Sequence, residues 1–348
     1  IKSSIPAYKT IQTFLHEAKN FKEDSYLDKN LNFTKDDILE FKNVNFFYTG
    51  SDAPSLKDIN IKIKANTSIG IVGQTGAGKS TFGNLILGLI KPTSGHIKIN
   101  ENTIQTNDDI NSWQKSISFV PQNLFLLETT IKNNIAFTLN EELIDMEKIK
   151  DSCDKAQLTD FVKSLKDGFD TEIGERGMKL SGGQQQRIGI ARAIALRPKL
   201  IICDEPVSAL DVSIQSQILN LLLDLQSEFG LAYLFIAHDL AVVKHISDRI
   251  AIMYLGQIVE TASGDAVYQD PRHPYTQSLI SAIPVPDPTM KKERIILSGD
   301  VPSPIAPPSG CHFHPRCPAC FEPCAETAPE LKETDAEHSV RCHLESKA

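Results

Sequence analysis

The sequence lacks the features of several protein classes. No apolar run approaches the length of a membrane span, because the candidates, residues 85–90 and 219–225, are short. The first residues, Ile1-Lys2-Ser3-Ser4, are not a secretory signal, and the absence of an initial Met indicates a fragment or a trimmed chain. Positive charge is not in excess, since the net charge is −8. This balance argues against bulk attraction to nucleic acid, and we expect no nucleic-acid partner.

Cysteine is scarce outside the tail. The five cysteines of the tail are Cys311, Cys317, Cys320, Cys324 and Cys342. Without a secretory signal, this cluster favours a bound metal over disulfides. Of 19 prolines, 13 follow Asp270, so we expect residues 263–348 to form a Pro/Cys-rich C-terminal region. Within it, residues 271–308 are predicted to be a loop-rich arm with one helix near 275–282.

The remaining composition is that of a globular protein, and 348 residues suffice for two domains. Apolar residues at helical spacing predict a lead-in helix at residues 5–22, and the charged, Asn/Asp-rich residues 24–37 read as a linker. Together, residues 1–37 are expected to precede the first domain.

One glycine-rich stretch organises the chain. It reads Gly73-Gln74-Thr75-Gly76-Ala77-Gly78-Lys79-Ser80-Thr81. An apolar strand is predicted at residues 69–72 and a helix from about Gly78. Strand, glycine loop and helix form the context of a phosphate-binding loop, in which backbone N–H groups and the helix N-terminus face the phosphates. Lys79 would reach the β- and γ-phosphates and Ser80 would coordinate Mg²⁺. The alternative is an ordinary glycine turn before a helix.

Further strands are predicted at residues 38–48, 59–63, 95–99 and 117–120. Tyr48 ends the first of them, where its ring could stack on adenine or belong to the core. Gln122 follows the last of them, where an amide could contact Mg²⁺ or water.

A helical lobe is predicted at about residues 123–180. After it, Ser181-Gly182-Gly183-Gln184 opens another helix and forms a second anion cradle without a lysine. Two such cradles suggest a site shared by two copies.

Carboxylates mark the end of the strand at residues 200–203. Asp204 would hold Mg²⁺ together with Ser80, and Glu205 would polarise an attacking water. Asp211 begins the next helix, and His238 ends the following strand, at residues 232–237. A histidine there could donate to a γ-phosphate, although a lone histidine is more often structural. The catalytic candidates are therefore Glu205, His238, Lys79 and Gln122.

With these residues assembled, residues 38–262 resemble the nucleotide-binding domain of an ABC transporter. The resemblance implies an α/β P-loop NTPase fold, with a RecA-like core, an antiparallel β-subdomain, a helical subdomain at about 123–180 and a Cys/Pro-rich C-terminal appendage. By position it implies Walker A at 73–80, the Q-loop at Gln122, the signature at 180–184, Walker B at 200–204, the catalytic base Glu205, the D-loop at 208–211, the switch His238 and the adenine-stacking Tyr48.

The two halves resemble different branches of this family. Residues 1–180 are similar to exporter and lipid-oligosaccharide flippase ATPases, on the basis of the segment at 171–177. Residues 184–348 are similar to oligopeptide and dipeptide importer ATPases, on the basis of the segments at 204–213 and 254–256, His273-Pro274-Tyr275-Thr276 and the Cys-rich tail. This difference predicts a mosaic joined near the signature.

In the importer branch, the cysteines matching Cys311, Cys317, Cys324 and Cys342 are implied to bind a [4Fe–4S] cluster. Cys320 is extra to that pattern. A Zn²⁺ site that includes Cys317 and Cys320 is the rival assignment, and free thiols are the third.

The resemblance implies an ATP- and Mg²⁺-dependent ATPase peripheral to the cytoplasmic face of the inner membrane. Its expected partners are a second ABC ATPase subunit, in a homo- or heterodimer, transmembrane subunits and a substrate-binding protein. Peptide uptake is favoured over export or flipping. A soluble ABC ATPase of DNA repair or translation is disfavoured, because no long coiled coil, second cassette or basic surface is evident. An inert binding module is disfavoured because every catalytic position is filled.

Overall fold

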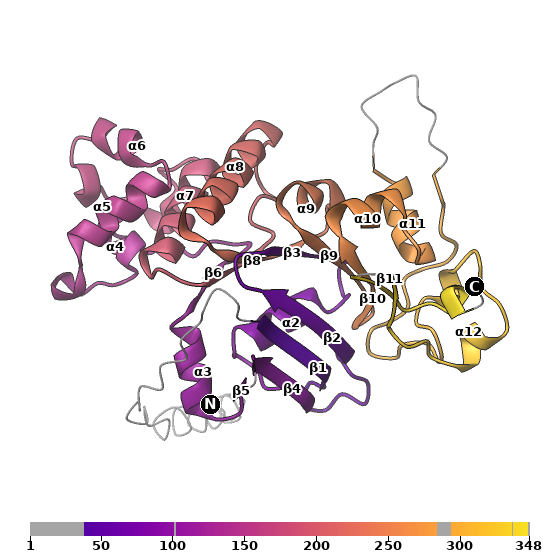
Figure 1. Ribbon diagram of the computed structural model, residues 1–348. Coiled ribbons are helices and arrows are strands. Elements are labelled where there is room, and N and C mark those ends of the chain that lie inside the picture. Colours follow the sequence, from indigo (N-terminus) through magenta and orange to yellow (C-terminus); the bar gives the residue numbers. More distant parts are fainter. Residues whose placement is uncertain (1–37, 101, 284–293, 336, 347–348) are drawn as a thin grey trace, which may run out of the picture.

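The computed structural model describes residues 38–100, 102–283, 294–335 and 337–346. The lead-in helix and linker expected at residues 1–37 lie outside the described residues. The described chain forms two β-sheets, a helical lobe and a C-terminal region that packs beside the larger sheet (Figure 1).

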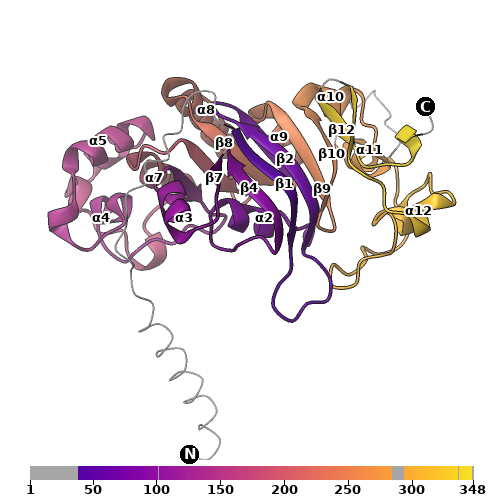
Figure 2. The same cartoon turned by 60° about the horizontal axis from the view of Figure 1, so that its bottom comes forward.

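The smaller sheet is antiparallel, in the order β2-β1-β4-β5. Its strands are β1 (Ile38–Phe46), β2 (Leu56–Lys64), β4 (Ser94–Ile99) and β5 (Asn102–Thr103). Apolar and polar residues alternate in β2, whose core face carries Ile59, Ile61 and Ile63. This alternation buries one face of the sheet and leaves the other to solvent. In Figure 2 the sheet stands beside α2 (Lys79–Ile86).

The larger sheet is mixed, in the order β11-β12-β10-β9-β3-β8-β7-β6. Its strands are β3 (Ser68–Val72), β6 (Ile117–Val120), β7 (Leu200–Asp204), β8 (Ala232–Ala237), β9 (Arg249–Tyr254), β10 (Gln257–Ser263), β11 (Lys332–Asp335) and β12 (His338–Val340). The pairs from β6 to β9 are parallel, and the pairs from β9 to β11 are antiparallel. Every residue of β3 and β8 is buried, as expected for parallel strands covered on both faces.

The helices lie on both sides of this sheet. Besides α2 they are α3 (Asn107–Gln114), α4 (Ile131–Ala136), α5 (Met146–Lys155), α6 (Thr159–Ser164), α7 (Gly182–Ala195), α8 (Val212–Phe229), α9 (Leu240–Ile246), α10 (Gly264–Gln269), α11 (Pro274–Ser281) and α12 (Pro323–Glu326). The helical lobe contains α4, α5 and α6, and α7 joins it to the sheet (Figure 1).

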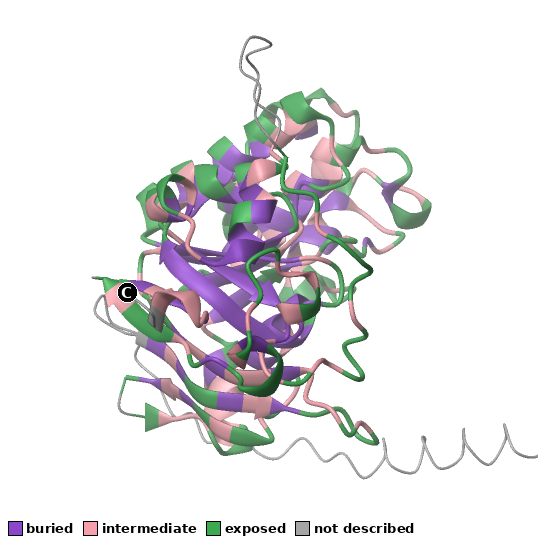
Figure 3. Cartoon of the chain, turned by 90° about the vertical axis from the view of Figure 1, so that its right-hand side faces the viewer, coloured by how far each residue is buried: buried purple, intermediate pink, exposed green. Residues whose placement is uncertain are grey.

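Two hydrophobic cores flank the larger sheet, and alternate residues of each central strand enter one or the other. Ile202 packs with the small sheet and α2, whereas Ile201 packs with the helical lobe, α7 and α8. Figure 3 shows the buried strands between exposed outer segments. This packing leaves only the ends of the strands open, so the phosphate loop and the strand-end carboxylates share one edge.

The C-terminal region contains the loop-rich arm expected at residues 271–308, of which the described residues 294–308 have no helix or strand. Its helix α11 lies where one was predicted, but β12 also pairs with β10 and so extends the larger sheet. Phe313 is almost fully buried in the core that it shares with the larger sheet, and Val340 of β12 is almost fully buried as well. The sequence did not indicate this, because β11 and β12 are short and their residues are largely polar.

Candidate active site

The glycine loop joins β3 to α2. Gly76 and Gly78 have φ values of 82° and 98°, in the left-handed region that favours glycine. A Cβ on Gly73 would lie 2.4 Å from the Met253 carbonyl oxygen, so this position also requires glycine. The loop therefore turns tightly between the end of β9 and the N-terminus of α2, which is the geometry expected of a phosphate loop.

Lys79 is folded back on that loop. Its Nζ donates to the carbonyl oxygens of Gly73, at 2.6 Å, and Gln74, at 3.3 Å. Burial lowers the pKa of Lys79, while the charges of Glu205 and Asp204 act in the opposite direction. Both hydrogen-bond partners are neutral, so this buried cation attracts an anion into the loop.

Three strand ends bring three polar side chains together. Glu205 follows β7, and its Oε1 lies 3.2 Å from Nδ1 of His238, which follows β8. Its Oε2 accepts a hydrogen bond from Nε2 of Gln122, at 3.0 Å, in the loop after β6. The predicted catalytic residues Gln122, Glu205 and His238 thus form one cluster.

Asp204 lies beside this cluster at the end of β7. Burial raises its pKa, the adjacent charge of Glu205 raises it further, and Lys79 lowers it. Asp204, Ser80 and Gln122 line the same cavity. A carboxylate, a hydroxyl and an amide oxygen are a donor set that suits Mg²⁺, which would also relieve the repulsion between the two carboxylates.

A cavity of about 990 Å³ contains these groups. Its lining residues are Ser55, Gly73, Gln74, Thr75, Gly76, Ala77, Gly78, Lys79, Ser80, Thr81, Gln122, Asp204, Glu205, His238, Leu279, Val301 and Pro304. The last three belong to the C-terminal region and were not predicted, because isolated apolar residues in helices and loops carry no sequence signal for a site. Ser55 was also missed, because a single serine outside any motif carries no sequence signal for a site.

Tyr48 lies next to the loop. Its hydroxyl is 3.2 Å from the Thr81 hydroxyl, and its ring meets Phe46 edge-on, with the centroids 4.9 Å apart. The residue is 47% exposed, which is against a core role and leaves a ring face accessible to a base.

Comparisons with known proteins identify the family. A profile described as "ABC transporter" matches residues 56–208, and one described as "Oligopeptide/dipeptide transporter, C-terminal region" matches residues 259–324. The oligopeptide transport ATP-binding protein OppF of Escherichia coli (strain K12) is 45% identical over 82% of this chain and 86% of its own. The oligopeptide transport ATP-binding protein AppF of Bacillus subtilis (strain 168) is 43% identical over 85% and 91%.

The chain belongs to the ABC transporter ATP-binding proteins. Among solved structures, a bacterial Atm1-family ABC exporter with ATP bound matches 79% of this chain at 28% identity, with a TM-score of 0.65. This chain spans 47% of that exporter's length. CbiO1 of Clostridium perfringens, part of an ABC transporter complex, matches 68% of this chain and 92% of its own at 27% identity, with a TM-score of 0.58.

Relatives of the importer branch and of the exporter branch each align on both sides of the junction expected near residue 184. The alignment with OppF covers 291 residues, so it must extend well to the N-terminal side of residue 184. The family is therefore shown for both halves of this ABC ATPase.

The signature segment lies outside the cavity of its own chain. Ser181 caps α7: its hydroxyl accepts the N–H of Gln184, and the Gln184 side chain accepts the N–H of Ser181. A Cβ on Gly183 would lie 2.9 Å from Ile214 of α8, so the glycine lets α7 and α8 approach. Asp211 is the N-cap residue of α8. None of the residues from Ser181 to Gln184, nor Asp211, lines the phosphate cavity of this ABC ATPase.

The tail cysteines form a compact module around α12. Cys311 lies within electrostatic range of Cys317, Cys324 and Cys342, and its N–H donates to the Cys324 carbonyl. Burial raises the pKa of Cys311 and of Cys317 to about 11. Cys320 is exposed. Among the described residues, no three His, Cys, Asp or Glu side chains are arranged to hold a metal ion.

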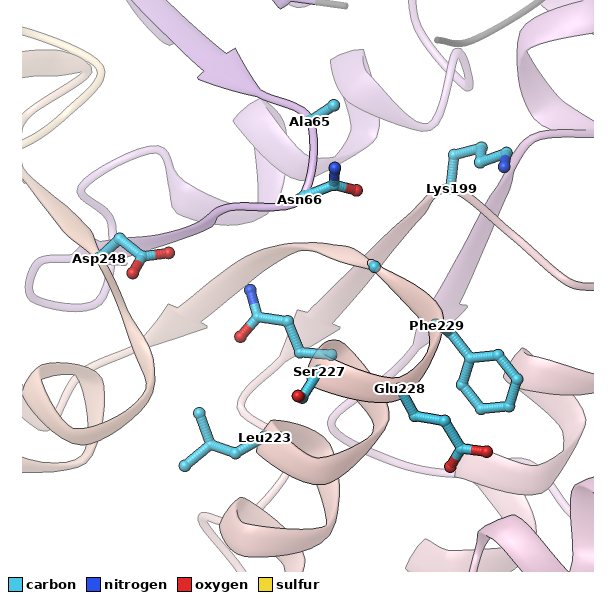
Figure 4. A pocket seen from close by; sticks show the side chains of 10 residues that line it. Ala65, Asn66, Lys199, Leu223, Ser227, Glu228, Phe229 and Asp248 are labelled. Carbon is cyan, nitrogen blue, oxygen red and sulfur yellow. The ribbon is translucent and has the colours of Figure 1, made fainter. Parts of the chain in front are cut away.

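A second cavity, of about 830 Å³, lies at the opposite edge of the larger sheet (Figure 4). Asn66 precedes β3, Lys199 precedes β7, and Gly230 precedes β8, so the cavity adjoins the N-terminal ends of the parallel strands. It contains none of the predicted site residues. In the described part of the chain, no helix has both the length and the apolar character needed to cross a bilayer.

Proposed function

We propose that this ABC ATPase energises the uptake of oligopeptides through a membrane transporter. The relatives named above are oligopeptide transport proteins, and a peptide-transporter profile matches the C-terminal region. The observation that carries the catalytic part is the cluster of Gln122, Glu205 and His238 at the mouth of the phosphate loop. We take the ATPase domain as residues 38–262, with the helical subdomain at about 123–180, and the C-terminal region as 263–348.

In this proposal each residue has a definite task. Residues Gly73–Thr81 bind the phosphates through their N–H groups and Lys79, and Tyr48 stacks on adenine. Ser80, Gln122 and Asp204 would hold Mg²⁺, which would neutralise phosphate charge when bound. Glu205 accepts a proton from the attacking water, and His238 donates to the γ-phosphate.

A second ABC ATPase subunit completes the site. Ser181 and the N-terminus of α7 form an exposed anion cradle that has no lysine and does not face its own phosphate loop. In a head-to-tail pair, Ser181, Gly182, Gly183 and Gln184 of one subunit, together with its Asp211, would face the ATP held by the other. ATP then joins the two subunits, and hydrolysis separates them.

The surface for the transmembrane subunits is an apolar groove of about 700 Å³ between the larger sheet and the helical lobe. We define this docking groove by Leu89, Phe119, Phe137, Leu143 and Leu196, all well exposed. Exposed apolar surface of this kind marks an interface. We assign this groove to a helix of a transmembrane subunit. The loop that carries Gln122 follows Phe119 directly, so a helix bound in the groove would be coupled to the ATP site. The chain then lies peripherally at the cytoplasmic face of the membrane, and a substrate-binding protein supplies the peptide on the other side.

In the tail, we assign a [4Fe–4S] cluster to Cys311, Cys317, Cys324 and Cys342. The assignment rests on the resemblance of the tail to the importer branch and on the proximity of Cys311 to the other three thiols. The arrangement of the described side chains does not itself favour a cluster over Zn²⁺, because no three of them are placed to hold a metal ion. Such a cluster would staple loops that contain little regular structure. An absorbance band near 400 nm (roughly) and bound iron in anaerobically purified protein would support it. Stoichiometric zinc without iron would replace the assignment.

Reconstitution tests the whole proposal. The ABC ATPase is combined with candidate peptide-importer membrane subunits in liposomes, and ATP hydrolysis and peptide movement are measured together. Stimulated hydrolysis with inward movement is expected. Movement in the opposite direction would favour the second candidate, an exporter or flippase ATPase, which the exporter neighbour and the segment at 171–177 favour. Hydrolysis that no membrane subunit stimulates would contradict both.

A further inference from the structure

The His273-Pro274-Tyr275-Thr276 segment has no task in the function described above, yet it is firmly held. Nδ1 of His273 accepts the N–H of Tyr275, at 3.0 Å, and so caps α11. The N–H groups of Arg272 and His273 each donate to the Glu260 carboxylate, at 2.9 Å. Glu260 lies in β10 and is fully buried. The start of α11 is therefore fixed to the larger sheet.

From this fixed point, Tyr275 reaches the phosphate loop. Its side chain is fully buried, and its hydroxyl accepts the N–H of Gln74, at 3.3 Å. Burial raises the pKa of Tyr275 to about 12, so the hydroxyl keeps its proton at neutral pH. Leu279, one turn further along α11, lines the phosphate cavity itself.

Tyr275 and Lys79 contact the same peptide group of the phosphate loop. The N–H of Gln74 and the carbonyl of Gly73 belong to the same planar peptide group. Tyr275 holds its N–H, and Lys79 Nζ holds its carbonyl oxygen, at 2.6 Å. Rotation of that peptide would break both contacts. The tyrosine hydroxyl therefore sets the orientation of the group that positions the lysine.

Tyr275 is also part of an aromatic cluster that includes the cysteine module. Its ring centroid lies 4.7 Å from that of Tyr254 and 5.4 Å from that of Phe313. Phe313 lies between Cys311 and Cys317 and is 1% exposed. Because close-packed side chains transmit strain, a change in the packing of the module would shift the ring of Tyr275.

We propose that Tyr275 is a positioning residue for ATP, which fixes the Gly73–Gln74 peptide and makes the phosphate loop responsive to the packing of the cysteine module. The proposal deepens the function of the same site and rests on ATP binding at the loop. It assigns the His-Pro-Tyr-Thr segment a task in nucleotide binding that acts through the phosphate loop.

The first test compares two tyrosine hydroxyls of one cluster. Tyr275→Phe removes the contact to Gln74 and keeps the ring, whereas Tyr254→Phe removes a hydroxyl that does not contact the loop. Affinity for a fluorescent ATP analogue, ATPase kinetics and the melting temperature without nucleotide are measured on the full chain. Tyr275→Phe should weaken binding and raise KM about three- to tenfold, with kcat at saturating ATP nearly unchanged. Tyr254→Phe should bind like the parent.

Equal weakening in both variants would show a merely structural cluster, and parental affinity in Tyr275→Phe would remove the residue from nucleotide binding. Either result overturns the proposal. If the parent protein itself bound no ATP, the fault would lie in the proposed function instead.

A double-mutant cycle tests the link to the module. Phe313→Leu keeps an apolar side chain but loses the ring contact, and it is made in both the parent and Tyr275→Phe. If Phe313 acts through Tyr275, Phe313→Leu weakens ATP binding in the parent but has little further effect in Tyr275→Phe. Additive effects would show that Phe313 does not act through the tyrosine.

Discussion

At the scale of single residues, the role of Glu205 depends on its backbone conformation, which the sequence motif does not reveal. Its φ of 47° is unusual for a residue other than glycine, and its N–H donates to the Ile236 carbonyl, at 2.8 Å. Such a backbone costs about 1–3 kcal/mol and persists where the surroundings hold it. Here it directs the carboxylate toward Gln122 and His238 rather than along β7.

Glu205→Gln should slow ATP hydrolysis about 10²–10⁴-fold, the usual contribution of a positioned general base, and leave ATP binding near the parental value. Single-turnover hydrolysis and nucleotide affinity measure the two effects separately. Glu228→Gln, at the C-terminal end of α8 and remote from the phosphate cavity, is the control and should retain parental activity. Parental hydrolysis in Glu205→Gln would assign the base to another residue.

The residues of the phosphate loop could be identified from the sequence because they are consecutive in the chain, so the motif determines the local structure. Gly73–Ser80 is a local motif, and so is Ser181–Gln184. The contact between Gln122 and Glu205 could not be derived that way, since it joins loops from two strands that are neighbours only in the folded sheet. No sequence pattern marks Ser55 or Pro304 as a residue of the site.

At the scale of elements, helix N-termini carry much of the site, and α7 allows a direct test. Ser181→Ala removes its capping hydroxyl, and Thr130→Ala removes the equivalent cap of α4 in the helical lobe. Each should lower the free energy of unfolding by about 1 kcal/mol. Only Ser181→Ala should also abolish most ATPase activity, because only this hydroxyl would face ATP bound by a second subunit. Equal activity of the two variants at equal stability would contradict that role.

The capping residue of α11 gives a pH dependence. Burial lowers the pKa of His273 from 6.5 to about 4. Between these values the unfolded chain binds a proton at this residue that the folded chain does not, so the free energy of unfolding falls as the pH falls. Above about pH 6.5, the ordinary value, this contribution is constant, and it is worth roughly 3 kcal/mol in total.

Urea unfolding of the parent and of His273→Asn between pH 7 and pH 5 checks this expectation. Asparagine can still cap the helix, but it does not titrate. The variant should therefore show a slope against pH that is smaller by up to one proton. Identical slopes would mean that another group is responsible.

At the scale of the molecule, substitutions in the docking groove can test coupling to the membrane subunits separately from ATP binding and hydrolysis. Leu143 is 71% exposed and lines the groove, while Leu139 is 70% exposed and does not. Leu143→Glu should lose stimulation by the membrane subunits and keep ATP binding, because a buried charge at an interface is costly. Leu139→Glu should behave like the parent in both assays. Loss of stimulation in both variants, or in neither, would move the interface elsewhere.

The predictability of the fold also depends on scale. The strands and helices around the phosphate loop follow from local patterns, and β8 was predicted with its observed bounds. The joining of β12 to β10 was not predicted, because strands so far apart in the chain pair through contacts that no local pattern records. The burial of Phe313 against Tyr254 and Tyr275 was missed for the same reason, since these residues are also far apart in the chain.

The late position of β12 in the chain has a consequence for biosynthesis. Until residues 338–340 leave the ribosome, β10 presents one unpaired edge, although its Ile258 and Val259 are buried in the finished protein. Such an edge is a template for pairing between nascent chains. A gene shortened upstream of that strand would therefore be expected to yield insoluble product even though every residue of the phosphate loop were intact.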